Sequence, residues 1–107
     1  MADEDVERRS DVRGPRRDLW AELPDGARLT VLEAGRKGVF LAHDDPDTFA
    51  LGARLEIAIA GAQGKAAARC EVVRKEIQPR KGIALLIVSM SPAAETIYVA
   101  LLGDPED

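Results

Sequence analysis

The chain has 107 residues, of which 46% are hydrophobic and 32% charged, so it provides for one domain with one modest core. The net charge of −4 argues against a molecule that binds nucleic acid or membranes through its overall charge. One cysteine, Cys70, and one histidine, His43, can form neither an internal disulfide nor a zinc-binding cluster.

The N-terminus does not have the pattern of a targeting segment. Residues 1–5 are small or acidic after the initial methionine, whereas a signal peptide needs an apolar run. No apolar segment reaches the length of a membrane-spanning helix. We therefore expect a cytoplasmic protein without membrane insertion.

Residues 1–17 are expected to form a flexible leader, which is acidic at first and rich in arginine after residue 7. This leader holds five of the chain's eleven arginines and precedes the first hydrophobic run, so it lies outside the core. Guanidinium groups suit phosphate oxygens and the Hoogsteen edge of guanine, because they are planar, charged and forked. The leader is therefore either a solvated tail or an anion-binding segment.

Alternation of apolar and polar residues predicts strands along most of the remaining chain. The expected strands span residues 18–23, 27–33, 39–42, 53–60, 65–77 and 83–88. Turn signals with glycine or proline separate most of them, and residues 43–50 form an acidic loop. The alanines of 65–77 could equally favour a helix, but the helical period is not obeyed. Residues 83–88 are apolar on both faces, so we expect the most buried strand there.

The last element differs from the others. Ser91 followed by Pro92 is typical of a helix start, which predicts a helix over residues 93–102. We expect this helix to cap an open edge or mouth of the sheet structure and to bury Ile97 and Leu101.

Short strands joined by turns, followed by one helix, indicate an all-β fold of the small barrel or sandwich type. The expected organisation is a leader over 1–17, a single domain over 18–102 and a tail over 103–107.

No group of side chains has the arrangement that catalysis requires. His43 lies in the acidic loop, where a solvated role is expected, and Cys70 falls on an apolar strand face and is expected to be inert core. The acidic run lacks the spacing of an EF-hand calcium loop. We therefore predict that the protein is not an enzyme and has no metal site and no cofactor.

Two short motifs and the order of the strands resemble the PilZ domain family, which binds the bacterial second messenger cyclic di-GMP. That family has an RxxxR leader, a D/N-x-S-x-x-G motif between its second and third strands, a six-stranded antiparallel barrel and a terminal helix. Here Arg9-Ser10-Asp11-Val12-Arg13 matches the first motif, and Glu33-Ala34-Gly35-Arg36-Lys37-Gly38 falls where the second belongs. The resemblance covers roughly residues 7–102 and implies the same barrel with one C-terminal helix.

The second motif departs from the family pattern. Glu33 stands in place of Asp or Asn, Gly35 in place of Ser, and only Gly38 is retained. Losing two ligand hydrogen bonds would weaken binding by on the order of 10²–10⁴-fold. Read without the resemblance, the two glycines suit turn positions with positive φ.

The resemblance implies a small adaptor that binds cyclic di-GMP and regulates a partner protein in motility, exopolysaccharide or polarity signalling. The implied ligand-binding residues are Arg8, Arg9, Arg13, Glu33, Gly35 and Gly38. In this family an arginine at the position of Arg8 goes with binding of a stacked ligand dimer.

Two alternatives remain at this point. One is a degenerate adaptor that no longer binds cyclic di-GMP and acts by protein contact alone. The other is a small β-barrel that binds nucleic acid, against which the 4% aromatic content and the net charge both count.

Overall fold

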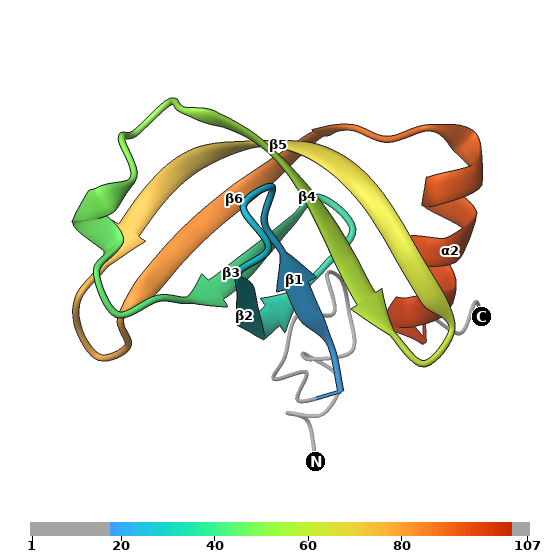
Figure 1. Ribbon diagram of the computed structural model, residues 1–107, viewed down its shortest axis with the longest axis horizontal. Helices are drawn as coiled ribbons and strands as arrows, with labels where there is room; N and C mark the ends of the chain where they lie inside the picture. The colour runs from blue at the N-terminus through green and yellow to red at the C-terminus, as the bar shows by residue number, and fades with distance from the viewer. Residues whose placement is uncertain (1–17, 104–107) are drawn as a thin grey trace, which may run out of the picture.

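The computed structural model describes residues 18–103 and shows a strand-rich domain with one long helix (Figure 1). Its elements in chain order are β1 (Trp20–Glu22), β2 (Arg28–Ala34), β3 (Gly38–Ala42), the 3₁₀ helix η1 (Pro46–Thr48), β4 (Arg54–Gly61), β5 (Gly64–Glu76), β6 (Gly82–Ser89) and the helix α2 (Pro92–Leu102). The predicted all-β fold, with six strands and a C-terminal helix, is confirmed.

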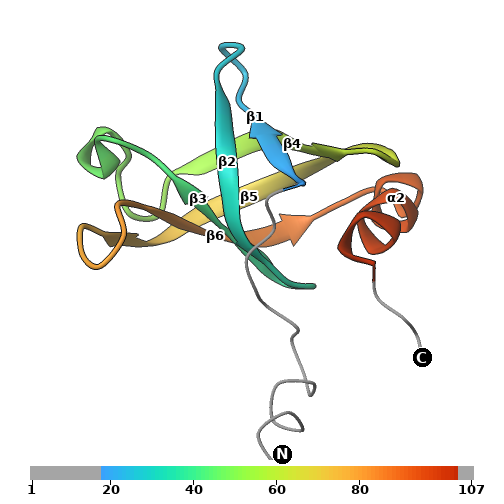
Figure 2. The same ribbon diagram turned by 90° about the horizontal axis from the view of Figure 1, so that it is seen from below.

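The six strands close into an antiparallel barrel in the order β1-β2-β3-β6-β5-β4, and pairing of β1 with β4 completes the ring. The long strand β5 pairs with β4 along its first half and with β6 along its second half. Figure 2 shows β2 and β1 crossing the other strands at a steep angle. Closure gives every strand two neighbours over part of its length, which reduces the unpaired sheet edge that small β proteins otherwise have to protect.

The barrel interior is filled by the inward-facing residues of each strand. On β5 the predicted alternation is confirmed, because Ala66, Ala68, Cys70 and Val72 are all buried. Leu41 of β3 is fully buried in the same cluster. The strand interpretation of 65–77 is therefore correct.

Strict alternation fails in β2, where the structure has a register shift between Val31 and Glu33. Val31 and Ala34 are both buried, with two partly exposed residues between them. A bulge of this kind changes the direction in which the following side chains point. The bulge therefore sets where Glu33 points, which strict alternation over 27–33 did not anticipate.

The expectation for β6 is wrong in its second half. Gly82 to Leu85 are buried, but Leu86 and Val88 are 42% and 41% exposed. Pairing with β3 ends at Leu86, which lies opposite Gly38, so the outward side chains beyond that point have no neighbouring β3 residue to cover them.

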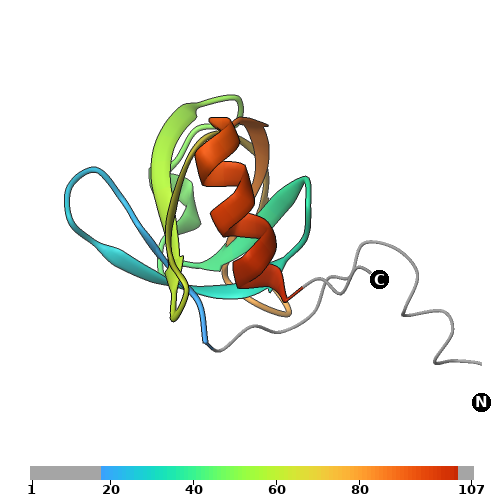
Figure 3. The ribbon, with the colours of Figure 1, turned by 90° about the vertical axis from the view of Figure 1, so that its right-hand side faces the viewer.

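The helix α2 begins as predicted, with the Ser91 hydroxyl accepting a hydrogen bond from the Ala94 backbone N–H at 3.0 Å. It packs against β5 and β4 on one side of the barrel (Figure 3). Tyr98 and Leu101 are buried, whereas Ile97 is only partly buried. Within residues 18–103, no helix has the length and apolar character needed to cross a membrane.

Candidate functional site

The structure describes half of the predicted ligand-binding residues. Glu33, Gly35 and Gly38 lie in the connection from the end of β2 to the start of β3, here called the motif loop (residues 33–38). The predicted leader residues lie outside the described part of the chain: Arg8, Arg9 and Arg13. The site can therefore be built from the side of the motif loop.

The motif loop is tied to β6 through its backbone. The Gly35 N–H donates to the Gly38 carbonyl at 2.9 Å, and the Ile87 N–H donates to the Lys37 carbonyl at 2.8 Å. A Cβ atom on Gly38 would lie 2.5 Å from the Leu85 carbonyl oxygen, a distance that side chains essentially never show.

Gly38 is therefore required by the close approach of β3 to β6. The expectation that Gly35 and Gly38 supply a positive φ is wrong, since neither is among the glycines with such a φ in the described residues. At Gly38, the position that the sequence resemblance assigned to ligand binding therefore has a packing reason of its own to be glycine.

The helix α2 is joined to the motif loop by one buried hydrogen bond. The Tyr98 hydroxyl donates to the Gly35 carbonyl at 2.6 Å, across 63 residues of sequence, and Tyr98 is 2% exposed. Gly35 itself is buried. No local pattern in the sequence connects Tyr98 with the motif loop, which lies 63 residues away.

Glu33 lies on the other side of the motif loop, in a group of charged residues around an aromatic ring. The Arg80 guanidinium donates to one Glu33 oxygen at 3.0 Å and lies 4.3 Å from the centre of the Phe40 ring. Arg74 lies 6.0 Å from the same ring, and Glu76 is within 3.9 Å of Arg80. Phe40 is only 3% exposed, although it is outside the main core cluster.

Arg80 is thus a cation at the candidate site that sequence analysis missed. It lies in the connection from β5 to β6, 47 residues from Glu33. No local sequence pattern distinguishes Arg80, which is partly buried, from the exposed arginines. Only closure of the barrel brings the β5–β6 connection to the motif loop.

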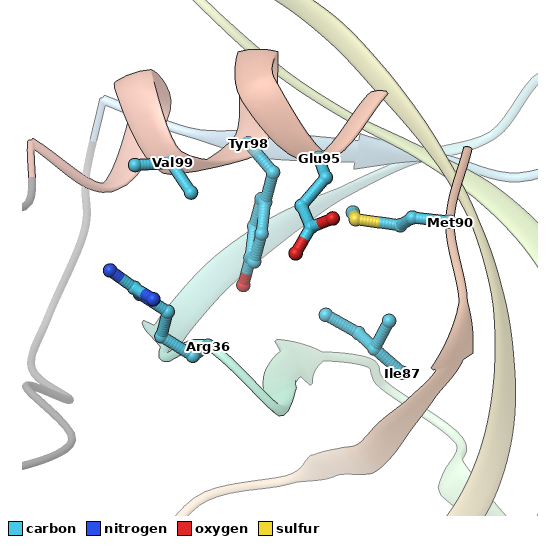
Figure 4. A pocket seen from close by; sticks show the side chains of 6 residues that line it. All are labelled: Arg36, Ile87, Met90, Glu95, Tyr98 and Val99. Atoms are coloured by element: carbon cyan, nitrogen blue, oxygen red, sulfur yellow. The ribbon is translucent and has the colours of Figure 1, made fainter. Parts of the chain in front are cut away.

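A small open pocket of about 140 Å³ lies between the motif loop, the end of β6 and α2 (Figure 4). Its lining residues are Arg36, Ile87, Met90, Glu95, Tyr98 and Val99. The Tyr98 side chain that lines it is the one that bonds to Gly35. The motif loop therefore contributes to two separate features, which are the pocket beside α2 and the charged group around Glu33.

The other two potentially reactive side chains, Cys70 and His43, have surroundings that indicate a structural role. Cys70 is fully buried in the barrel, and burial raises the pKa of its thiol to about 11. His43 accepts a hydrogen bond from the Asp45 N–H through Nδ1, and its ring packs edge-on against Phe49. In the part of the chain from 18 to 103, no group of three or more His, Cys, Asp or Glu residues could hold a metal ion.

Solved structures resemble this fold, although no protein-family model and no curated protein matches the chain. An uncharacterized Legionella protein, Lpg0364, superposes with a TM-score of 0.61 at 14% identity, covering 82% of this chain and 86% of that one.

The Bacillus subtilis inhibitor of motility, MotI/DgrA, superposes with a TM-score of 0.64 at 18% identity. The match covers 90% of this chain and 48% of that protein, so the chain spans about half the length of MotI/DgrA. At these identities the two matches establish a shared fold.

Proposed function

We propose that this protein is a small PilZ-type adaptor that binds cyclic di-GMP and regulates a partner protein in motility, exopolysaccharide or polarity signalling. The observation that carries the proposal is the motif loop, which is held at its two glycines by β6 and by Tyr98. The fold shared with an inhibitor of motility supports the same assignment.

The chemistry of each proposed site residue indicates which part of cyclic di-GMP it contacts. Arg9 and Arg13 contact the guanine edges and phosphates of the ligand, and Arg8 contributes if a stacked dimer is bound. The motif loop forms the opposite wall. A loop already held by backbone hydrogen bonds loses little conformational freedom on binding, so less of the interaction energy is spent on ordering it. Ordering of the leader against the barrel then presents a new surface to the partner.

The contacts of Glu33 affect the affinity that we expect for cyclic di-GMP. Its carboxylate already accepts a hydrogen bond from Arg80, so a ligand donor has to share that group. Gly35 supplies no hydroxyl. We therefore expect weaker binding than a complete D/N-x-S-x-x-G motif would give.

Isothermal titration calorimetry with cyclic di-GMP in low salt tests the proposal. The wild-type protein is expected to bind, and the double variant Arg9→Ala/Arg13→Ala is expected to lose at least 100-fold in affinity. The matched control is Arg16→Ala/Arg17→Ala, which removes the same charge from the leader but leaves RxxxR intact. An absence of heat with wild-type protein at high micromolar ligand would refute the proposal.

A variant that is designed to bind cyclic di-GMP more tightly provides the complementary experiment. The variant Glu33→Asp/Gly35→Ser restores the family pattern and adds a hydroxyl at the motif loop. We expect it to bind cyclic di-GMP roughly 10-fold or more tightly than the wild type. Equal or weaker binding by a folded variant would show that these positions do not contact the ligand.

One observation favours a second candidate, a degenerate adaptor that acts by protein contact alone. The two altered positions of the motif have structural partners of their own, namely Arg80 for Glu33 and Tyr98 for Gly35. In that case the Arg9→Ala/Arg13→Ala variant should retain its partner in a pull-down, whereas a receptor that depends on the ligand should release it.

A further inference from the structure

Arg80 is held against the Phe40 ring beside the motif loop, and the ligand contacts that the family resemblance implies do not include it. We propose that Arg80 is a further ligand-contacting residue, whose guanidinium plane stacks on one guanine base of cyclic di-GMP. This inference rests on the proposed function, to which it adds a third point of contact besides the RxxxR leader and the motif loop.

Both terminal nitrogens of the Arg80 guanidinium are directed at carboxylates. Nη1 donates to Glu33 Oε2 at 3.0 Å, and Nη2 lies 3.9 Å from Glu76 Oε1. Arginine binds phosphate through N–H donors that lie in the plane of the guanidinium, so a phosphate would compete with these two carboxylates for the same edge. A contact through the face of the guanidinium meets no such competition.

One face of this guanidinium is turned to the Phe40 ring. The Arg80 Cζ atom lies 4.3 Å from the centre of the ring, and Phe40 is only 3% exposed, so the ring is covered. The Arg80 side chain itself is 36% exposed. Because the inner face and both terminal nitrogens have partners, the outer face is the part of the guanidinium that a ligand can reach.

A planar base is the part of the proposed ligand that suits such a face. Guanidinium groups stack on aromatic rings and on nucleobases, because both are flat and their π electrons attract the cation. Stacking of this kind accepts any base, since every base has a π face. We therefore expect Arg80 to add affinity, whereas the selection of guanine stays with the groups that contact the edge of the base.

The position of Arg80 allows it to act on the same ligand as the motif loop. Its partner Glu33 is the first residue of that loop, and Phe40 lies opposite Glu33 in the pairing of β2 with β3. Arg74 donates two hydrogen bonds to Glu76 and so helps to hold the second carboxylate in place. The guanidinium is thus oriented before a ligand arrives, which reduces the cost of ordering it on binding.

Isothermal titration calorimetry with cyclic di-GMP compares Arg80→Lys with the wild type. Lysine retains the positive charge and can still pair with Glu33, but it has no planar face. We expect Arg80→Lys to bind roughly 10-fold more weakly, which corresponds to the loss of one stacked base. The matched control is Arg69→Lys, which should bind as the wild type does. Arg69 likewise donates to a carboxylate, that of Glu56, at 2.9 Å, and it lies on β5, outside the motif loop.

The side-chain NMR signal of Arg80 distinguishes stacking from a phosphate contact. Protons that lie above the plane of a guanine ring shift upfield, whereas an N–H that donates to a phosphate shifts downfield. In isotope-labelled wild-type protein we expect the Arg80 Nε–H proton to move upfield when cyclic di-GMP is added. This measurement requires no substitution, so it tests the inference independently of how well Arg80→Lys folds.

Two results would overturn the inference while the wild type still binds cyclic di-GMP. One is equal affinity of the wild type and a folded Arg80→Lys variant, and the other is an unchanged or downfield-shifted Arg80 Nε–H proton. An absence of binding by the wild type would refute the proposed function and this inference with it. Whether the wild type binds therefore distinguishes the two failures.

Discussion

At the level of single residues, the motif loop depends on a missing Cβ atom and on one carbonyl group. Gly38 leaves room for the Leu85 carbonyl of β6, and the Gly35 carbonyl receives the Tyr98 hydroxyl. The first contact lies between backbone atoms, so rotation of a side chain cannot relieve it, and the second joins a buried side chain to the backbone. The loop should therefore be sensitive to very small substitutions.

Gly38→Ala is expected to destabilise the protein by about 1–3 kcal/mol, because the added methyl group forces β3 and β6 apart. Urea unfolding followed by circular dichroism measures the change. Lys37→Ala, at the exposed neighbouring position, serves as the control and should change the unfolding free energy by less than about 0.5 kcal/mol. Equal stability of the two variants would contradict the packing role of Gly38.

Tyr98→Phe is expected to cost about 1–3 kcal/mol, since the buried Gly35 carbonyl loses its hydrogen-bond donor. For a domain of this size a loss of 1 kcal/mol lowers the melting temperature by roughly 4–8 °C. Thr96→Ala removes another hydroxyl of α2, one that is exposed and bonded within the helix, and should have little effect. An unchanged melting temperature of Tyr98→Phe would show that this hydrogen bond does not contribute to the stability of the protein.

At the level of elements, the three-residue strand β1 completes the barrel and carries a cluster of side-chain contacts. Glu22 accepts hydrogen bonds from the Trp20 indole at 3.0 Å and from Lys65 of the neighbouring hairpin at 2.9 Å. Arg28 lies 5.0 Å from the centre of the Trp20 ring. These contacts join β1 to β2 and to the β4–β5 hairpin, on either side of it.

The Glu22 cluster makes stability depend on pH. The hydrogen bonds from Trp20 and then from Lys65 hold the pKa of Glu22 below its usual value of 4.5. A carboxylate whose pKa is lowered by folding stabilises the protein above that usual value and loses its contribution as the pH falls through the lower, folded one. Thermal melts between pH 6 and pH 3 should therefore fall more steeply for the wild type than for Glu22→Gln. Parallel profiles for the two proteins would exclude this contribution.

At the level of the whole molecule, closure of the barrel makes opening a cooperative event. The interior residues come from all six strands, so no strand can leave without exposing the core it shares with the others. Cys70 reports such opening, because it is fully buried on the central part of β5 and its thiol pKa is about 11.

Labelling of Cys70 at pH 8 with a disulfide reagent should thus be slower in the native protein than in urea by several orders of magnitude. Where opening is in rapid equilibrium, a loss of 1 kcal/mol raises the open fraction about fivefold. Tyr98→Phe should therefore accelerate labelling by at least that factor. Rapid labelling of the native wild type would show that the barrel opens locally at β5.

Interactions between neighbouring residues were sufficient to predict the six strands and the helix α2, but not the short 3₁₀ helix η1. Alternation identified the strands, including β5 with its many alanines, and Ser91-Pro92 identified the start of α2. These signals are local, because the direction of a side chain on a strand and the capping of a helix depend on residues a few positions apart.

The surroundings of the candidate site depended on tertiary structure. Glu33 meets Arg80 across 47 residues, and Gly35 meets Tyr98 across 63. A bulge after Val31 sets the direction of Glu33, and the packing of β3 on β6 explains Gly38. The sequence alone determined which residues occupy the motif loop, including glycine at positions 35 and 38. Only closure of the barrel decided which groups surround the motif loop. Closure brings together connections that are far apart in the sequence, and local sequence patterns do not indicate such contacts.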